Sequence, residues 1–434
     1  MKDFNNIFEK NKISYIEFQF TTILGEFKSV EFPVKIWDEM KEGTGIDGSS
    51  LGFLKTEQSD MQIIPDLDSF RIIPDKIQDP WDTRTGSFIC DITDNKGKPY
   101  STCPRGILKK QLTIAADLGY EYITRPELEW YFLKKNLEPA DDGSYMDLYP
   151  KDKLSYLRRK ISDSLLNAEI GIKTIHHEVG PGQHEIEFLP LNALHQADNV
   201  QIAKNFIKRI AYDNKFIASF MPKPLSSEAG NGLHIHQYLT KNGLNIFADK
   251  EKGISDTLRY YIGGIQKYID EFSLILNPIP NSYKRLIPNH EAPIYDTWGI
   301  ANRTALIRVP GYEKSARIEY RAGDAAMNIY LGTAVLLAAG LEGIKKKYDP
   351  KEPVNFNVDN LTNEELAKLN IRELPRNFEK ALKGFEKSDF IKKVLGKEMK
   401  ELFAQLKRKE FNNYKKAIDT GNERKWEIDN YLDC

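Results

Sequence analysis

The feature of this sequence that most constrains its fold is a short segment in which acidic and apolar residues alternate. In Ile175–Phe188 (IHHEVGPGQHEIEF), Glu178 and Glu185 lie on either side of a Gly-Pro-Gly turn, and after the turn two glutamates alternate with two apolar residues. Side chains of a strand point to opposite faces in turn, so the pattern predicts a strand with one acidic and one apolar face.

The same alternation recurs in three other segments: Glu127–Phe132 (ELEWYF), Leu233–His236 (LHIH) and Ala316–Arg321 (ARIEYR). Any one of them alone would be read as an ordinary solvated strand face. Solvated faces usually carry Thr, Lys and Ser, whereas these carry Glu and His, which bind metals, and Arg, which binds phosphate and carboxylate. Converging glutamates repel one another unless cations neutralise them. We therefore expect a metal site on a sheet.

Composition excludes several other classes of function. The chain has 434 residues, of which 29% are charged, and 62 basic against 63 acidic residues leave a net charge of −1, so no global field favours nucleic acid or an anionic membrane. Its three cysteines are widely spaced, which argues against a disulfide framework and against a Cys-ligated zinc. The start, MKDFNNIFEK, lacks the apolar core of a signal peptide, and the longest apolar run, 325–344, falls short of a clean membrane span. We expect a cytoplasmic protein.

The N-terminal part is predicted to be small and mostly β, because helical features are sparse before Lys109. Its expected elements are two strands around Gly25 within Ile13–Val34, a polar surface loop at Gly43–Ser50, a turn-rich segment at Asp79–Arg84 and a strand at Ser87–Asp91.

A helix at Pro104–Leu118 is predicted to open a larger domain. Periodicity predicts further helices near 153–168, 194–212, 256–271 and 325–345, Lys- and Glu-rich helices beyond Leu361, and a strand at Phe216–Pro224. The segment Asn277–Thr304 is expected to be a long loop, and loops of that length inside compact domains are often functional.

The residue types of the proposed site favour phosphoryl transfer. Carboxylates and imidazole without cysteine suit Mg²⁺ or Mn²⁺, and Arg285, Arg303, Arg308, Arg317 and Arg321 add anion-binding capacity. Cations that bridge phosphate oxygens, together with arginines, are what an ATP-using enzyme requires. The chain has neither a GxxxxGK[ST] nor a GxGxxG motif, which argues against a P-loop or protein-kinase fold. A zinc hydrolase using His234, His236 and glutamates is the alternative, and the arginine cluster weighs against it.

Longer motifs carry a resemblance that covers about residues 15–432. They are IDGSS with SDM and PD, PELEWYF, HHEVGPGQHEIEF, FMPKP, NSYKRLIPNHEAP, NRTALIRVP, ARIEYR and WEIDNYL. With these motifs the chain resembles type I glutamine synthetase. The resemblance implies an α+β fold, with a small N-terminal β-grasp domain at 1–102 and a large catalytic domain at 103–434 whose curved antiparallel sheet is flanked by helices. It also implies a homo-oligomer, a dodecamer of two stacked hexameric rings with shared active sites, that joins ammonia to glutamate with ATP through γ-glutamyl phosphate and so serves glutamine biosynthesis.

The resemblance also implies roles for residues, by motif position. Two cations, Mg²⁺ or Mn²⁺, would be held by Glu129, Glu178 and Glu185 and by Glu127, His234 and Glu319. ATP and its transferring phosphoryl group would meet His236, Arg303, Arg308, Lys314 and Arg317, and glutamate would meet Gly230, Arg285 and Arg321. Ammonium would meet Asp47 and Ser50 of a neighbouring subunit, Tyr145, Glu178 and Glu291, with Asp47 taking its proton and Glu291 closing the site.

The chain departs from the usual pattern of that family at four positions: Ala229 stands for asparagine, Tyr238 for serine, Lys173 for glutamate and Arg125 for glycine. Two other classes of function stay open beside the main one. One is a related ligase that joins glutamate to an amine other than ammonia, which would be expected to lose the ammonium pocket. The other is a non-catalytic paralogue, which would be expected to lose metal ligands.

Overall fold

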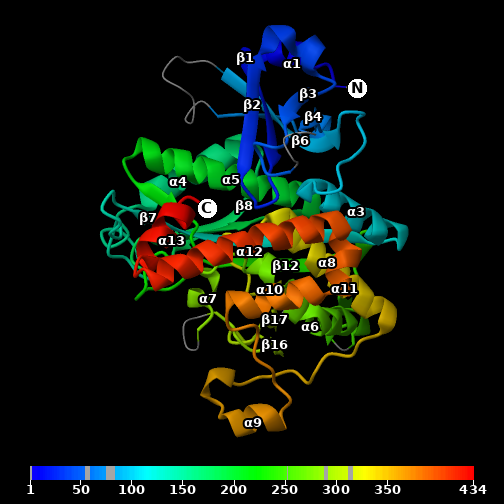
Figure 1. Cartoon of the computed structure of the whole chain (residues 1–434), viewed down its shortest axis with the longest axis vertical. Helices are drawn as coiled ribbons and strands as arrows, with labels where there is room; N and C mark the ends of the chain where they lie inside the picture. The colour runs from blue at the N-terminus through cyan, green and yellow to red at the C-terminus, as the bar shows by residue number, and fades with distance from the viewer. Residues whose placement is uncertain (1, 54–58, 75–83, 252, 288–291, 311–315) are drawn as a thin grey trace.

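A six-stranded sheet forms the N-terminal part of the chain, drawn in blue and cyan in Figure 1. The computed structural model describes residues 2–53, 59–74, 84–251, 253–287, 292–310 and 316–434. The strand order is β2-β1-β6-β4-β3, with β5 beside β6. The strands are β1 (Ile13–Thr21), β2 (Phe27–Pro33), β3 (Thr44–Asp47), β4 (Asp60–Pro65), β5 (Arg71–Ile72) and β6 (Arg84–Asp94). The predicted hairpin around Gly25 is present, and Gly25 has the positive φ of +97° that favours glycine.

Helices α1 (Phe4–Lys10) and α2 (Trp37–Met40) and strands β3, β4 and β5 of this part were not predicted. Helix α1 is capped by the side chain of Asp3, and with α2 it covers the sheet through Phe4, Phe8 and Trp37. A helix this short has too few turns to show a periodic pattern, so its stability comes from packing. The segment expected as a loop at 43–50 contains β3, which pairs with β4. The turn-rich segment at 79–84 lies outside the described residues apart from its last residue.

A ten-stranded sheet organises the rest of the chain, in the order β16-β17-β18-β12-β7-β9-β8. β10 and β11 pair with β7, and β13 pairs with β12. All pairings are antiparallel except β16 with β17. The strands are β7 (Glu121–Leu133), β8 (Ile172–His177), β9 (Gln183–Phe188), β10 (Leu191–Asn192), β11 (Ile217–Ser219), β12 (Leu233–Lys241), β13 (Leu244–Asn245), β16 (Trp298–Ile300), β17 (Ile307–Val309) and β18 (Ile318–Tyr320); β14 (Ala248–Asp249) and β15 (Gly253–Ile254) form a separate pair.

Helices pack around this sheet, as predicted for an α+β fold. They are α3 (Pro104–Asp117), α4 (Ser155–Asn167), α5 (Ala193–Asp213), α6 (Asp256–Leu276), α7 (Ser282–Arg285), α8 (Ile329–Lys346), α9 (Asn363–Lys368), α10 (Phe378–Lys387), α11 (Asp389–Leu395), α12 (Lys397–Asp419) and α13 (Glu423–Tyr431). The central α8 is buried on nearly all sides and packs on α3, α5 and α6. Its apolar character does not make it a membrane span, since within the described ranges no helix is both long and apolar enough to cross a bilayer.

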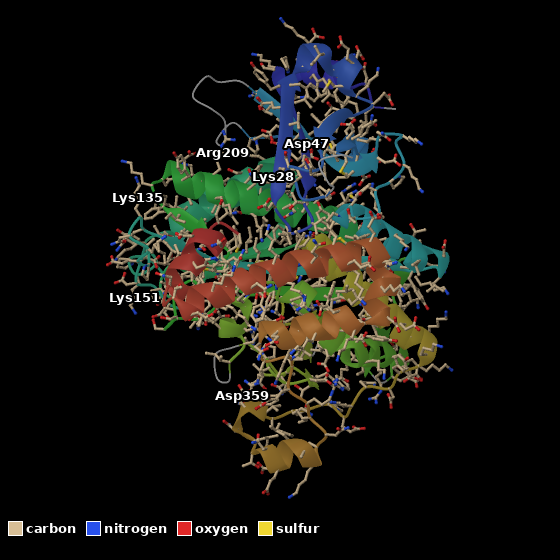
Figure 2. All side chains as sticks on the ribbon, viewed as in Figure 1. Lys28, Asp47, Lys135, Lys151, Arg209 and Asp359 are labelled. Carbon is tan, nitrogen blue, oxygen red and sulfur yellow. The ribbon has the colours of Figure 1, made fainter. Side chains whose placement is uncertain are left out.

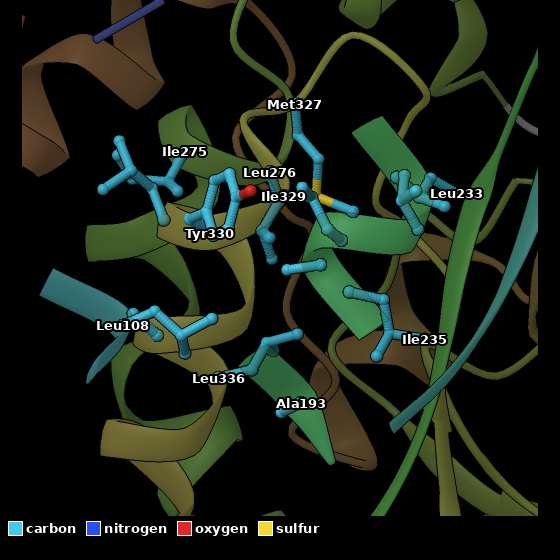
Figure 3. Close-up of a cluster of buried hydrophobic side chains, with 14 of the residues drawn as sticks. Leu108, Ala193, Leu233, Ile235, Ile275, Leu276, Met327, Ile329, Tyr330 and Leu336 are labelled. Carbon is cyan, nitrogen blue, oxygen red and sulfur yellow. The ribbon is translucent and has the colours of Figure 1, made fainter. Parts of the chain in front are cut away.

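The larger of the two clusters of buried apolar residues among the described residues includes the apolar face of the large sheet. Figure 3 shows Leu233 and Ile235 of β12 beside Met327 and the first turns of α8. Because strand side chains alternate, His234 and His236 must then point to the other face, away from these helices. The core therefore leaves the opposite face of the sheet free for polar chemistry.

Element boundaries differ from the predictions where local capping or tertiary pairing decides them. Helix α8 begins at Ile329 rather than near residue 325, because the side chain of Asn328 accepts hydrogen bonds from the next backbone N–H groups. The expected loop at 277–304 contains α7 and β16. The expected strand at 216–224 is confined to β11.

Buried charges join the two sheets. Arg105 of α3 contacts Asp198 of α5 at 3.0 Å, Asp91 of β6 at 2.9 Å and Asp66 at 2.8 Å. Tyr330 of α8 donates a hydrogen bond of 2.7 Å to the same Asp198. Because breaking one partner of a buried pair leaves an uncompensated charge, this cluster holds the N-terminal sheet in one position on the larger part.

Candidate active site

Strand register collects the predicted residues on one face of the large sheet. His236 lies opposite Glu319 of β18 on one side and opposite Arg125 of β7 on the other. The next row across the sheet is His234, Glu127, Glu187 and Thr174, and the row after it is Glu129, Glu185 and His176. Directly opposed residues in antiparallel strands share a face with Cβ atoms about 5 Å apart. Side chains that are far apart in the sequence thus form a grid.

This grid forms one wall of a cavity of about 1240 Å³. Many of its described lining residues are charged, and none of those described is a cysteine. Most of the sequence-predicted site residues line it: Glu127, Glu129, Tyr145, Glu178, Glu185, Gly230, His234, His236, Arg285, Arg303, Arg308, Arg317 and Arg321. Glu319 is almost wholly buried behind the surface of the cavity, where it contacts Arg308 and Arg321.

Two histidines contact Glu127. Its carboxylate lies 2.7 Å from Nε2 of His236 and 3.3 Å from Nδ1 of His234. Burial raises the pKa of Glu127, but the charges and hydrogen bonds of these two histidines outweigh burial and hold the pKa well below its ordinary value. Each oxygen of Glu127 therefore has a histidine nitrogen within hydrogen-bond distance.

Glu185 has the opposite environment. It lies directly across from Glu129, and its nearest basic group is Nε2 of His176 at 3.7 Å. Burial, together with the charges of Glu127, Glu129 and Glu178, raises the pKa of Glu185 well above its ordinary value. Within the described residues no lysine or arginine reaches it. Either a proton or a bound cation relieves repulsion between like charges this close, so this group could hold a cation.

Donor geometry agrees with cation binding on this face. One group of donor atoms within 4.8 Å of one another comes from His176, Glu178 and Glu185, and a second comes from Glu127, Glu185 and His234. Carboxylate oxygens with imidazole nitrogens suit Mg²⁺ or Mn²⁺. His176 was not singled out from the sequence, although its place two residues before Glu178 on the same strand face would have indicated it.

Arginines surround the carboxylates. Nη1 of Arg308 lies 2.6 Å from Glu319, whose buried carboxyl also contacts Arg321. Burial raises the pKa of Glu319, but the charge of Arg321 outweighs burial and lowers it to about 2. Nε of Arg317 donates a hydrogen bond of 3.2 Å to Nδ1 of His236. Arginine side chains therefore line the cavity beside the carboxylates, as phosphoryl transfer requires.

A glycine shapes the part of the cavity next to Arg285. Arg285 is buried and donates to the backbone carbonyl of Ala322 at 3.0 Å. A Cβ added at Gly230 would lie 2.5 Å from the carbonyl oxygen of Pro222 and 2.7 Å from Cγ of Arg285. Any side chain at position 230 would displace this arginine, so the glycine keeps the backbone close to it.

Two of the predicted ammonium-site residues lie away from this cavity. Asp47 ends β3 on the N-terminal sheet, and neither it nor Ser50 lines the cavity of its own chain. Figure 2 shows Asp47 well apart from Asp359, a residue that lines the cavity. Hydrogen bonds from Ser50 at 2.6 Å and from Ser49 at 2.7 Å lower the pKa of Asp47 to about 2. Glu291 and Lys314, the other predicted site residues, lie outside the described residues.

Comparisons with known proteins agree with this geometry. The family model "Glutamine synthetase, catalytic domain" matches residues 101–431, and the model "Glutamine synthetase, beta-Grasp domain" matches residues 12–95. The glutamine synthetase of Thermotoga maritima is 37% identical over 437 residues and that of Methanosarcina mazei is 39% identical over 438 residues. The alignments cover 98% of this chain and 98% and 96% of those two proteins.

Solved structures give the same result. A structure described as "GmaS/ADP complex-Conformation 1" aligns with a TM-score of 0.87 at 28% identity and covers the whole of both chains. A second, described as "Apo GmaS without ligand", aligns with the same TM-score, identity and coverage. The family models together span nearly the whole chain, and the relatives match it from end to end. The chain therefore belongs to the glutamine synthetase family.

Proposed function

We propose that this protein is a glutamine synthetase, which uses ATP to join ammonia to the γ-carboxylate of L-glutamate and releases L-glutamine, ADP and phosphate. The observation that carries the proposal is the opposition of Glu129 and Glu185 in a cavity lined by arginines. A buried pair of like charges beside cationic side chains is suited to divalent cations that hold a nucleotide's phosphates.

Two cation positions follow from the face of the sheet. Glu129, Glu178 and Glu185 would hold one Mg²⁺ or Mn²⁺, and Glu127, His234 and Glu319 would hold the other. When bound, the cations draw electron density from the phosphate oxygens and reduce the repulsion that a carboxylate nucleophile meets. The protein holds these ligands in position on strands whose opposite face packs against the hydrophobic core.

The cationic residues would orient the two anionic substrates. Arg308, Arg317, His236 and Lys314 would meet ATP, and Arg303 would stabilise the charge of the transferring phosphoryl group. Arg285 and Arg321, with the backbone at Gly230, would hold glutamate so that its γ-carboxylate attacks that phosphoryl group. The product of this step is γ-glutamyl phosphate, and ammonia then displaces the phosphate.

The ammonium site would be completed by a second subunit. Tyr145 and Glu178 line the cavity, and Asp47 and Ser50 of a neighbouring chain would approach it, with Glu291 closing the site. An anionic pocket attracts NH₄⁺, and Asp47 would take its proton to leave nucleophilic NH₃. We propose a homo-oligomer, a dodecamer of two stacked hexameric rings, in which such shared sites form. A cytoplasmic location also stays a prediction.

The test is release of phosphate with ATP, Mg²⁺ and glutamate, with ammonia compared to methylamine, ethanolamine and a polyamine. We expect kcat/KM to be highest with ammonia and glutamine to form in equal amount to phosphate. Glu129→Gln should abolish turnover, whereas Glu138→Gln, in an exposed ion pair with Lys134 just beyond the same strand, should leave it unchanged. A higher kcat/KM with one of the larger amines would show that this amine, and not ammonia, is the acceptor.

A further inference from the structure

Glu187 differs from Glu185 on the same face because the chain supplies counter-ions for Glu187. Its carboxylate lies 2.6 Å from Nη2 of Arg125 and 2.8 Å from Nζ of Lys173, and Oγ1 of Thr174 donates to it at 3.0 Å. Lys173 reaches both oxygens, the second at 3.1 Å. Charge-assisted hydrogen bonds thus occupy both oxygens of Glu187.

The position of Glu187 would otherwise suit a metal ion. It lies directly opposite Glu127, and donor atoms of Glu127, Glu187 and His236 lie within 4.8 Å of one another. This is the same spacing and the same donor chemistry as in the groups that contain Glu185. Geometry alone would therefore predict a third divalent cation at this row of the sheet.

Glu185 and Glu187 differ in the charged residues that surround them. Glu185 meets no lysine or arginine among the described residues, whereas Glu187 has two cationic partners that come from different strands. Arg125 approaches from β7, where it is 9% exposed, and Lys173 approaches from β8. A divalent ion entering between Glu127 and Glu187 would displace or repel the side chains of Arg125 and Lys173. In a partly desolvated site this repulsion between cations is poorly screened.

We propose that Arg125 and Lys173 act as a built-in counter-ion for Glu187 and thereby exclude a divalent cation from the Glu127–Glu187–His236 group. The proposal rests on the proposed function for the use of cations elsewhere in the cavity. In this proposal Arg125 and Lys173 limit the number of metal ions that bind in the cavity, and they do not contact a reacting atom.

The experiment counts bound Mn²⁺ per chain by equilibrium dialysis, with free Mn²⁺ read by electron paramagnetic resonance. The double variant Arg125→Gln/Lys173→Gln should bind one more Mn²⁺ per chain than the wild type. Adding Glu187→Gln to it should restore the wild-type count. The matched control, Lys134→Gln/Lys383→Gln, removes two lysines from exposed ion pairs and the same total charge, and it should not change the count.

A second variant keeps the proposal testable if the double variant does not fold. Glu187→Gln alone should bind as many Mn²⁺ ions as the wild type, because Glu187 ligates none. Loss of one Mn²⁺ in Glu187→Gln, or an unchanged count in a folded double variant, would overturn the proposal. Both results are differences in bound Mn²⁺ between a variant and the wild type. They are therefore independent of the test of glutamine formation, which measures the activity of the wild type.

Discussion

Carboxylates that share one face of the large sheet differ in the counter-ions that the chain provides. Glu127 has two histidines, Glu319 has two arginines and Glu187 has an arginine and a lysine. Glu185 has one histidine at 3.7 Å and a pKa raised by burial and by its acidic neighbours. Of these four carboxylates, Glu185 therefore has the weakest compensation from the chain's own basic groups.

Removing the charge of Glu185 should stabilise the metal-free protein but reduce the stability that the protein gains from bound metal. In a chelator, Glu185→Gln should raise the free energy of unfolding by about 1 kcal/mol, or the melting temperature by about 2 °C, because one of several like charges is gone. With Mn²⁺ added, the variant should gain less stability than the wild type, since a ligand is lost. Thermal unfolding with and without Mn²⁺ measures both.

The effect of Glu185 on stability has a defined sign in pH. Its folded pKa lies above the ordinary 4.5, so the metal-free protein holds this contribution fully below pH 4.5 and loses it as the pH rises through the folded value. Glu185→Gln should remove that loss, whereas the exposed control Glu138→Gln should not. A metal-free variant that melts below the wild type at neutral pH would contradict the repulsion.

Residue types on the strand faces were predictable, but their partners were not. Alternation placed Glu127, Glu129, His234 and Glu319 on ionisable faces. The first three line one wall of the cavity, and Glu319 lies buried behind it. The pairing of Glu187 with Arg125 and Lys173 depends on the register of three strands, which no local pattern encodes. The metal and substrate roles of the individual residues stay predictions.

Elements far from the cavity also position its residues. Helix α7 carries Arg285, and the preceding residue, Lys284, lies 2.7 Å from Glu427 and 2.6 Å from Glu423, both of α13. Glu427 is wholly buried. A four-residue helix has little stability of its own. We infer that α13 holds α7, and through it Arg285, at the wall of the cavity.

Loosening this contact should weaken glutamate binding and leave metal binding intact. Glu427→Gln removes the buried one of the two charges that hold Lys284, and we expect KM for glutamate to rise about tenfold, which corresponds to about 1.4 kcal/mol. Mn²⁺ affinity should not change. The control on the same helix is Asp429→Asn, whose ion pair with Lys425 is exposed. Equal KM values for Glu427→Gln and the control would show that α13 does not position Arg285.

Long elements were predicted better than short ones. Helices α3, α5 and α6 and strands β7, β9 and β12 agree with the periodicity of the sequence. Helix α7 and strand β16 lie inside a segment expected as a loop, because a single helical turn or a three-residue strand exists only through tertiary contacts. Helix α1 was missed for the same reason, since its stability comes from Phe4 and Phe8 packing on the sheet.

Asp47 raises the question of assembly at the scale of the whole molecule. Its carboxylate is exposed on the N-terminal sheet, has a pKa of about 2 and does not line its own chain's cavity. An exposed anion that is held by two serines and lies away from its own chain's cavity is suited to complete a site in another copy. If so, each active site needs residues from two chains, and activity depends on association.

Mixing two inactive variants tests this sharing directly. Asp47→Ala should lose use of ammonia, and Glu185→Gln should lose cation binding. When the two are dissociated and reassembled together at equal amounts, roughly one site in four should combine an intact cavity with an intact Asp47, so about a quarter of wild-type glutamine formation should return. A mixture of Glu129→Gln with Glu185→Gln should recover nothing, because both positions belong to one chain's cavity. Equal recovery in the two mixtures, or none in the first despite mixed oligomers by mass, would place Asp47 outside a shared site.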